Sequence, residues 1–284
     1  MPEGPELAYS RDRLRQVLVG HKIVDILALS SGRYDKKSPE GLNEMLQVNT
    51  SGRLKIESID TKGKFMSWKL SPESGDAWFM HCTYGMSGAW QLSPTKHAAI
   101  AVDYNVSGVG ITRDVRRVYF NDPRHFGTVK FVRGEAAHRK KLSTLGPCIL
   151  NDAVTSEIFA KNMLRKPTRT IAEALMDQSG VAGVGNYIKA EGLHRAGISP
   201  WRRVVDIEPH EYVTLCEVTL NVARESYASQ GATISTYRTV DGGKGTTQFD
   251  FQVYSRRNCP KGHVVRREET PEGRTSHWCP TCQR

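Results

Sequence analysis

Four residues near the C-terminus have the types and the spacing of metal ligands. Cys259 and His263 are separated by three residues, and after fifteen intervening residues Cys279 and Cys282 are separated by two. Thiolate and imidazole ligands in two close pairs form closed tetrahedral zinc sites, which leave no position open for chemistry. We therefore predict a structural Zn2+ site that braces a small β-hairpin. His277 is an alternative fourth ligand, and free thiols beside an ordinary loop histidine are the remaining interpretation.

A second chemical feature is the glycine-rich segment DQSGVAGVGNYIKAEGL, which reads as a tight turn followed by a helix. Gly180, Gly183 and Gly185 permit a tight turn with close backbone approach. Asn186 then falls near the start of the second helix, where free backbone amides can hold an anion such as phosphate. A plain helical hairpin, whose glycines only allow close packing, is the alternative.

The first residues of the chain, MPEGPE, place Pro2, Glu3 and Glu6 close together. Proline and acidic residues suit the first turn of a helix, because the helix dipole favours carboxylates there. Taken alone, this segment predicts the start of a helix and nothing more.

The elements that position these residues follow from periodicity. Apolar residues recur at helical spacing from Glu6 to Val19, and short β-prone runs separated by glycine, proline and serine follow from about residue 22 to 133. The predicted runs are 22–29, 53–60, 65–70, 77–84, 116–122 and 128–132. After about residue 140 we expect helix, glycine-rich turn and helix, then a long helix closed by Gly231, a glycine-rich loop and a short strand at 249–255. These patterns predict an α+β fold with two domains. The predicted divisions are an N-terminal β-sandwich with flanking helices at 2–140, a helical domain at 141–250 and a zinc finger at 251–284.

Composition and charge limit the class of protein. The chain has 284 residues, 38% of them hydrophobic, and forty basic against thirty acidic side chains give a formal charge of +10. Nine basic residues against three acids at 113–141, and seven against three at 254–284, suit a protein that contacts a phosphate backbone from more than one side. No apolar run approaches the length of a bilayer span, and no basic segment followed by an apolar stretch begins the chain. We therefore expect an intracellular protein that is neither secreted nor bound to a membrane. The isolated cysteines, Cys82, Cys148 and Cys216, are expected to be buried thiols.

Six motifs occur together in one order: PEGPE, KGKF, HCTYGMSG, NDPRHFGTV, DQSGVAGVGNYIKAEGL and the Cys-His-Cys-Cys finger. In this order they resemble the formamidopyrimidine-DNA glycosylase/endonuclease VIII (Fpg/Nei) family of base-excision repair enzymes. The resemblance runs through essentially the whole chain and is closest to Nei-like members with a Cys-His-Cys-Cys finger. It implies a helix-two-turn-helix domain, a bifunctional DNA glycosylase and abasic-site lyase, a structural zinc ion and no organic cofactor. It further implies DNA with oxidised bases or abasic sites as the partner, and a monomer.

The resemblance also assigns catalytic roles. After removal of Met1, Pro2 matches the nucleophile that attacks the sugar C1′, and an α-amino group titrates near about 8, so a useful fraction is unprotonated at neutral pH. Glu3 matches the general acid that protonates the opening sugar and then shuttles protons during elimination. Glu6 matches a carboxylate that helps to hold the amine and the sugar, and Lys64 matches a lysine that contacts phosphate near the lesion.

The same resemblance assigns DNA contacts. Asn186 and Arg274 match residues that grip the phosphates flanking the flipped nucleotide. Met86, Arg124 and Phe126 match three side chains that fill the gap left in the duplex, a task that suits an apolar group, an arginine and an aromatic wedge. For Met86 and Phe126, packing in the core is the alternative.

The chain also departs from the family pattern. His263 replaces a cysteine of the commonest finger, and His125 stands where another arginine is often found. The loop at 237–248 is somewhat shorter than in purine-selective members. These departures favour oxidised pyrimidines and hydantoin lesions over 8-oxoguanine.

Two other classes of function compete with the enzyme. One is a catalytically inactive protein that binds damaged DNA, against which the intact set Pro2, Glu3, Glu6 and Lys64 argues. The other is a zinc-finger DNA-binding regulator, which would explain the finger and the charge but leaves PEGPE without a purpose. Processing to a mature N-terminus at Pro2 would favour the enzyme.

Overall fold

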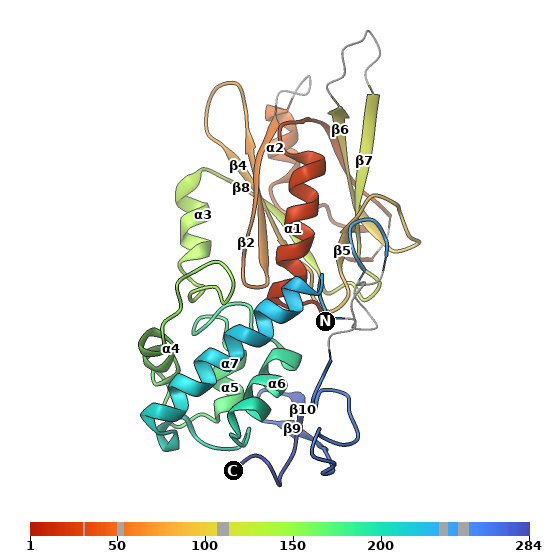
Figure 1. Cartoon of the computed structure of the whole chain (residues 1–284). Coiled ribbons are helices and arrows are strands. Elements are labelled where there is room, and N and C mark those ends of the chain that lie inside the picture. Colours follow the sequence, from red (N-terminus) through yellow and green to blue (C-terminus); the bar gives the residue numbers. More distant parts are fainter. Residues whose placement is uncertain (31, 50–53, 107–113, 233–237, 244–249) are drawn as a thin grey trace. The chain divides into compact units, whose positions relative to one another are not determined.

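The computed structural model describes the whole chain except residues 31, 50–53, 107–113, 233–237 and 244–249 (Figure 1). The chain divides into two compact units, each with its own contacts. The N-terminal unit comprises Met1–Pro2, Glu6–Ser143 and Thr233–Thr246, and the C-terminal unit comprises Glu3–Pro5, Thr144–Ala232 and Thr247–Arg284. Among the described residues, no helix is long and apolar enough to cross a membrane.

The N-terminal unit contains an antiparallel sheet in the order β5-β7-β6-β1-β2-β3-β4-β8. Strands β1 and β2 share a single registered pair, Lys22↔Lys55, so this joint divides the sheet into two halves of four strands. The halves pack together through their inner faces: Trp68 and Trp90 come from opposite halves, and their ring centroids lie 4.8 Å apart. This arrangement confirms the β-sandwich. The strands are β1 (Lys22–Ala28), β2 (Lys55–Lys62), β3 (Phe65–Ser71), β4 (Trp78–Thr83), β5 (Ala89–Gln91), β6 (Ala98–Val106), β7 (Asp114–Asn121) and β8 (Thr128–Arg133).

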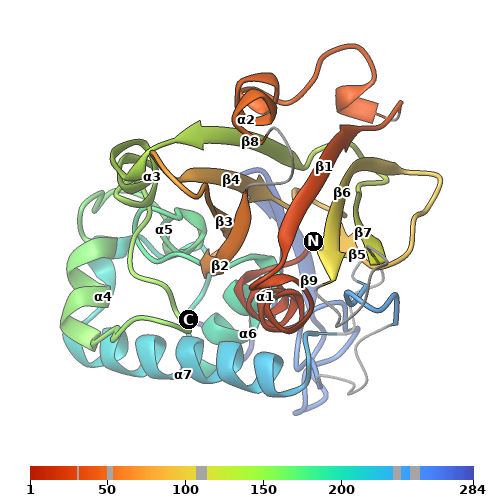
Figure 2. The ribbon, with the colours of Figure 1, turned by 90° about the horizontal axis from the view of Figure 1, so that it is seen from above.

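Helices flank this sandwich, and α1, with 15 residues, is the longest described helix of the N-terminal unit. It spans Gly4–Leu18, as the apolar spacing predicted, and Figure 2 looks almost along its axis. Leu7, Leu14 and Leu18 are fully buried in the core that the strands share. Burial of this face stabilises the helix against the sheet by about 1.5–3 kcal/mol for each leucine. The other helices of the unit are η1 (Gly32–Tyr34), α2 (Leu42–Val48) and α3 (Glu135–Leu142).

The C-terminal unit is helical and ends in a β-hairpin. Its helices begin and end at the expected residue types: Thr170 forms a capping box with Glu173, and Gly197 ends α6 in the left-handed conformation with φ 72°. The predicted order of helix, glycine-rich turn, helix and long helix is confirmed. The elements are α4 (Ser156–Met163), α5 (Ile171–Met176), α6 (Asn186–Ala196), η2 (Val204–Asp206), α7 (Pro209–Ala228), β9 (Arg266–Thr270) and β10 (Arg274–Trp278).

The predicted strand at 249–255 is wrong over its described part: residues 250–255 form no strand, and residues 252–255 form bends and a turn. The backbone amides there bind a side chain instead of a neighbouring strand. The buried carboxylate of Glu191 accepts hydrogen bonds from the amides of Gln252, Val253 and Tyr254 at 2.8–3.0 Å. Amides that are satisfied by a carboxylate cannot also pair in a sheet, so alternating apolar residues did not produce a strand.

Candidate active site

The carboxylate of Glu3 lies at the N-terminus of α6 within the C-terminal unit. Glu3 is 2% exposed, and its Oε1 and Oε2 accept hydrogen bonds from the amides of Tyr187 and Ile188 at 2.9 and 3.4 Å. The next residue, Gly4, donates its amide to the carbonyl of Gly183 at 3.0 Å. A helix N-terminus and charge-assisted bonds from free amides both favour an ionised carboxylate. The anion at these two amides is therefore the chain's own Glu3, where the sequence had suggested a phosphate.

Two glycines of the turn make this approach possible. A Cβ on Gly185 would lie 2.2 Å from Cδ of Glu3, and Gly183 has φ 112°, a conformation that side chains rarely adopt. The glycines therefore make room for the N-terminal segment, which a plain helical hairpin would not require.

A hairpin turn lies against the same end of α6. Asn186 Nδ2 donates to the carbonyl of Thr275 at 2.9 Å, next to Arg274, the first residue of β10. One helical turn further along α6, Lys189 pairs with Glu272 at 2.5 Å. The structure thus brings Asn186 and the strand that carries Arg274 together, as two residues of one site require.

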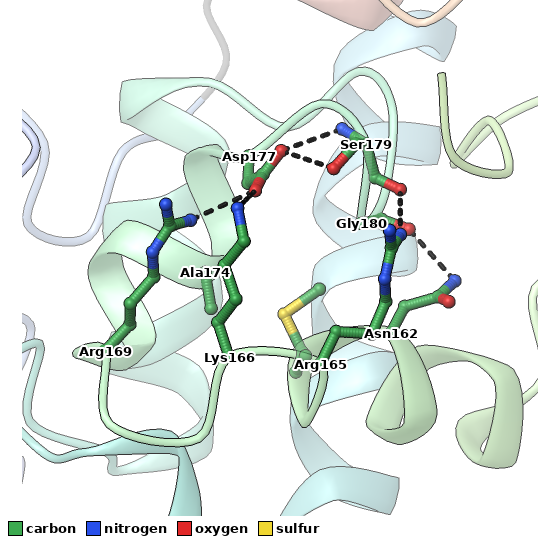
Figure 3. A pocket seen from close by; sticks show the side chains of 9 residues that line it. Asn162, Arg165, Lys166, Arg169, Ala174, Asp177, Ser179 and Gly180 are labelled. Atoms are coloured by element: carbon green, nitrogen blue, oxygen red, sulfur yellow. Dashed lines mark hydrogen bonds and ion pairs between the residues drawn. The ribbon is translucent and has the colours of Figure 1, made fainter. Parts of the chain in front are cut away.

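An ionised cluster holds the start of the glycine-rich turn (Figure 3). Asp177 Oδ1 accepts from the amide and the hydroxyl of Ser179 at 3.0 and 2.7 Å, and its Oδ2 lies 3.4 Å from Lys166 and 3.0 Å from Arg169. Partial burial opposes ionisation of Asp177, but the Ser179 bonds and the Lys166 charge outweigh it and lower the pKa to about 2. Asp177 therefore stays charged at neutral pH and anchors the turn.

The other predicted catalytic residues belong to the N-terminal unit. Pro2 is buried, and Glu6 is fully buried in the first turn of α1. Lys64 is half-buried on the tight turn between β2 and β3, where Gly63 has φ 58°. Pro2 directly precedes Glu3 in the chain, so a peptide bond joins Pro2 of the N-terminal unit to Glu3 of the C-terminal unit.

Met86, Arg124 and Phe126 lie on two loops of the N-terminal unit that touch each other. A Cβ on Gly85 would lie 2.6 Å from the carbonyl carbon of Phe126, so the two loops are in close contact. The guanidinium of Arg124 lies 5.3 Å from the ring centroid of Phe126, within the range of a cation–π interaction. Phe126 is 51% exposed and Met86 is half-buried, so packing in the core does not account for Phe126.

Hydrogen bonds with Asp122 and Ser87 fix the loop that carries Arg124 and Phe126. Asp122 accepts from the amide of Gly127 at 2.6 Å and from the hydroxyl of Ser87 at 3.2 Å, and Ser87 accepts from the amide of Arg124 at 3.1 Å. A cavity of about 280 Å³ opens beside this loop. Most of the residues that line it are polar, and they include Ser87, Gln91, Asn121, Arg124 and Arg238.

The four predicted metal ligands meet in the C-terminal unit. The ligand atoms of Cys259, His263, Cys279 and Cys282 all lie within 4.8 Å of one another. Sγ of Cys282 is 3.3 Å from Nδ1 of His263 and 4.0 Å from Sγ of Cys259. His277 is not a member of this group. A tetrahedral zinc ion with Zn–S near 2.3 Å and Zn–N near 2.0 Å sets ligand atoms roughly 3.5–3.8 Å apart, so this group fits zinc.

Several residues that support the site carried no signal strong enough to be predicted. Lys189 lies three residues after Asn186, which places both on one face of α6. A lysine on this face has no explanation in the sequence, because its partner Glu272 lies in the turn of the hairpin. Glu272 binds Lys189, and Asp122 accepts a hydrogen bond from Ser87. These partners lie 83 and 35 residues apart in the chain, so no local pattern predicts the contacts.

Comparison with known proteins gives a consistent result for both units. A model of the formamidopyrimidine-DNA glycosylase N-terminal domain matches residues 1–129, and a model of the formamidopyrimidine-DNA glycosylase H2TH domain matches residues 145–238. The chain is 34% identical to formamidopyrimidine-DNA glycosylase of Thermus thermophilus, covering 100% of this chain and 98% of that protein. It is 31% identical to the enzyme of Prochlorococcus marinus, covering 100% of both.

Solved structures agree with these matches. The crystal structure of the MutM (Fpg) protein from Thermus thermophilus has a TM-score of 0.81 at 31% identity, covering 99% of this chain and 98% of that one. The complex of Lactococcus lactis Fpg with DNA containing an abasic site has a TM-score of 0.83 at 24% identity, covering 99% of both chains, which is a likeness of fold.

Proposed function

This chain belongs to the formamidopyrimidine-DNA glycosylase family of base-excision repair, and we propose that it excises oxidised bases and then cleaves the strand at the resulting abasic site. The observation that supports this most directly is the position of Glu3: its buried carboxylate is held by two amides and directly follows Pro2. A binding protein has no need of a fixed carboxylate beside an imine-forming amine.

In the proposed reaction Pro2, freed by removal of Met1, attacks C1′ of the sugar through its secondary amine. The bond from C1′ to the base breaks, and the base leaves with its bonding electrons and takes a proton from water. The bond from C1′ to the ring oxygen then opens, and an iminium joins Pro2 to the ring-opened sugar. The iminium acidifies the hydrogens on C2′. Loss of one of these protons expels the 3′ phosphate, and a second elimination expels the 5′ phosphate. Hydrolysis of the imine then frees the enzyme.

Two carboxylates and a lysine assist these steps in the proposal. Glu3, held by two amides as a carboxylate, accepts the proton that the Pro2 amine releases on attack and delivers it to the sugar ring oxygen as the ring opens. It later carries protons during elimination. Glu6, fully buried in the first turn of α1, supports the cationic amine and the sugar. Lys64, on its tight turn, contacts a phosphate near the lesion.

DNA binding is proposed at two places, one on each unit. Asn186 and Arg274, which the hairpin holds at one end of α6, contact the phosphates that flank the flipped nucleotide. Met86, Arg124 and Phe126 fill the space that the flipped base leaves, and the 51% exposure of Phe126 supports a wedge. The formal charge of +10 favours a phosphate backbone as partner. Lactococcus lactis Fpg, which shares this fold, is solved with DNA containing an abasic site.

The finger is proposed to hold a structural zinc ion through Cys259, His263, Cys279 and Cys282. With four protein ligands the ion has no open coordination position, so it supplies no chemistry to the reaction. It braces the hairpin of β9 and β10, which lies between the two pairs of ligands. No organic cofactor is proposed, and the enzyme is proposed to act as a monomer inside the cell.

The proposed substrates are oxidised pyrimidines and hydantoins. Half of the loop at 237–248, on which this preference partly rests, lies outside the described residues; only 238–243 are described. The cavity beside Arg124 supports recognition of a base, because arginine donors pair with the acceptor edges of bases.

Trapping with borohydride tests the proposed function. The Met1-processed protein is mixed with a duplex that contains one abasic site, reduced, and examined for a covalent protein–DNA band. The band is expected for the natural protein. It is expected to disappear with one extra residue before Pro2, because the nitrogen of Pro2 is then an amide and cannot form an iminium. Tight binding without a band would instead identify a catalytically inactive protein that binds damaged DNA.

A further inference from the structure

Lys189 on α6 is a fully buried lysine, with no exposed surface. Lysine is almost never fully buried unless its charge is paired. Its ammonium lies 2.5 Å from Glu272, whose side chain is 10% exposed and lies in the turn between β9 and β10. Burial lowers the pKa of Lys189, and the hydrogen bond and charge of Glu272 oppose that effect. Removing both charges of a buried ion pair from water costs free energy that their attraction does not always repay. The position of this pair therefore requires a reason other than stability.

The position of the pair relative to Arg274 supplies that reason. Asn186 and Lys189 are three residues apart, so they project from one face of α6. Asn186 binds the carbonyl of Thr275, and Lys189 binds Glu272. These two contacts bracket Arg274 on both sides in sequence and attach its strand to the helix at two points.

The turn itself is tightened by the same carboxylate. The hydroxyl of Thr270 lies 2.7 Å from Oε1 of Glu272 and 2.9 Å from the carbonyl of Arg274, and Thr270 is 2% exposed. Gly273 between them has φ 70°, so the turn is compact. Glu272 therefore links the buried lysine to the backbone of Arg274 through one short network.

Lys189 also interacts with two charges of the candidate site, Glu3 and Arg274. The first interaction is attractive and the second is repulsive. Because Glu272 lies against Lys189, it neutralises a charge that would otherwise repel Arg274 from this end of α6.

We propose that Lys189 is a positioning residue: paired with Glu272, it holds the β9–β10 turn on α6 so that Arg274 stands beside Asn186 to receive a DNA phosphate. This inference rests on the proposed function, which makes Asn186 and Arg274 phosphate contacts. Lys189 itself is enclosed and does not touch DNA in this account. Its effect on binding is transmitted through Arg274.

The test uses the full-length, Met1-processed protein and a duplex with a tetrahydrofuran abasic analogue that cannot be cleaved. Lys189→Met together with Glu272→Gln removes both buried charges without leaving one unpaired. Lys189→Arg keeps the charge. The double variant leaves the net charge unchanged, whereas Arg274→Ala removes one positive charge. Lys161→Met removes one exposed positive charge from α4 of the same unit and is the net-charge control for Arg274→Ala. Thermal unfolding reports whether each variant is folded. Lys189→Gln together with Glu272→Gln, which also leaves no buried charge unpaired, serves if the first double variant does not fold.

The expected result is a loss that a purely structural residue would not cause. The double variant should bind about tenfold more weakly, and the slope of log K against log salt should fall by about 0.9, the contribution of one phosphate contact. Arg274→Ala should show the same two changes. The triple variant should be no worse than Arg274→Ala, because the residues act through one contact. Lys189→Arg should stay within about threefold of the natural protein, and Lys161→Met should keep the natural slope.

Two results would overturn the inference. One is a folded double variant with the natural affinity and salt slope. The other is a triple variant whose loss of affinity equals the product of the losses in the double variant and in Arg274→Ala. Because the duplex cannot be cleaved, the outcome does not depend on lyase activity. A protein that fails to trap on abasic DNA but shows the paired losses would support the positioning role and refute the proposed lyase reaction.

Discussion

Replacement of Gly185 by alanine should displace the carboxylate of Glu3 while leaving the fold intact. The new Cβ would lie 2.2 Å from Cδ of Glu3. The backbone of Gly185 is extended, with φ −127°, so alanine adopts it without strain. The atom in the way is the end of a flexible side chain, and the clash is relieved when the carboxylate moves by about 1 Å or more. A displacement of that size separates Glu3 from the amides of Tyr187 and Ile188.

The size of the effect follows from this displacement. A catalytic group that is misplaced by about 1 Å can lose roughly 100-fold in rate, which corresponds to about 2.7 kcal/mol. The stability should fall by less, by about 1–2 kcal/mol, because the carboxylate loses one short and one long hydrogen bond to backbone amides. Activity should therefore fall much more than the temperature of unfolding.

The assay is single-turnover cleavage of a duplex with one abasic site, together with a thermal unfolding curve. Gly180→Ala is the matched control, because it lies in the same turn and its Cβ would meet atoms no nearer than 3.3 Å. Its cleavage rate should stay within about threefold of the natural rate. A natural cleavage rate for Gly185→Ala would refute the role of Glu3 placement, and so would an equal loss in the two variants.

Three further predictions follow from other parts of the molecule. Phe126→Ala should change the free energy of unfolding by no more than about 0.5 kcal/mol, since the ring is 51% exposed, but should slow base excision from duplex DNA about tenfold or more; equal rates on duplex would contradict a wedge. Asp177→Asn should abolish a pH-dependent part of the stability. Because folding lowers the pKa of Asp177 from 3.8 to about 2, that part is complete above pH 4–5 and is lost as the pH falls from about 3.8 to 2. Over this pH range, the free energy of unfolding in urea should fall by about 1 kcal/mol more in the natural protein than in Asp177→Asn, after allowance for solvent screening. The same pH profile in both proteins would exclude this contribution of Asp177. Removal of metal by a chelator, or Cys279→Ser, should lower DNA affinity and the unfolding temperature, with about one zinc ion lost per chain by metal analysis; an unchanged protein free of metal would contradict the structural role.

Much of the fold could be predicted because its signals are local. The helix at the N-terminus, the runs that became β1, β2, β3, β4, β7 and β8, and the helices around the glycine-rich turn all follow from apolar spacing and end signals. Strands β5 and β6 were not predicted: β5 has three residues, and β6 begins with alanines, which have little preference for strands. The four metal ligands could be predicted because their spacing alone brings them together.

The sequence by itself therefore determined the kind of domain, the metal ligands and, through motifs in one order, the family. Only the tertiary structure decided how the site is built. It joins Glu3 to Tyr187 and Lys189 to Glu272, and it groups Glu3–Pro5 with the C-terminal unit and Thr233–Thr246 with the N-terminal unit. The predicted divisions are three continuous ranges, 2–140, 141–250 and 251–284, so they contain no such exchange of segments between units. They stay a prediction. The physical reason is that periodicity reports on neighbours within a few residues, whereas a buried carboxylate or ammonium is stabilised by partners that only folding brings near.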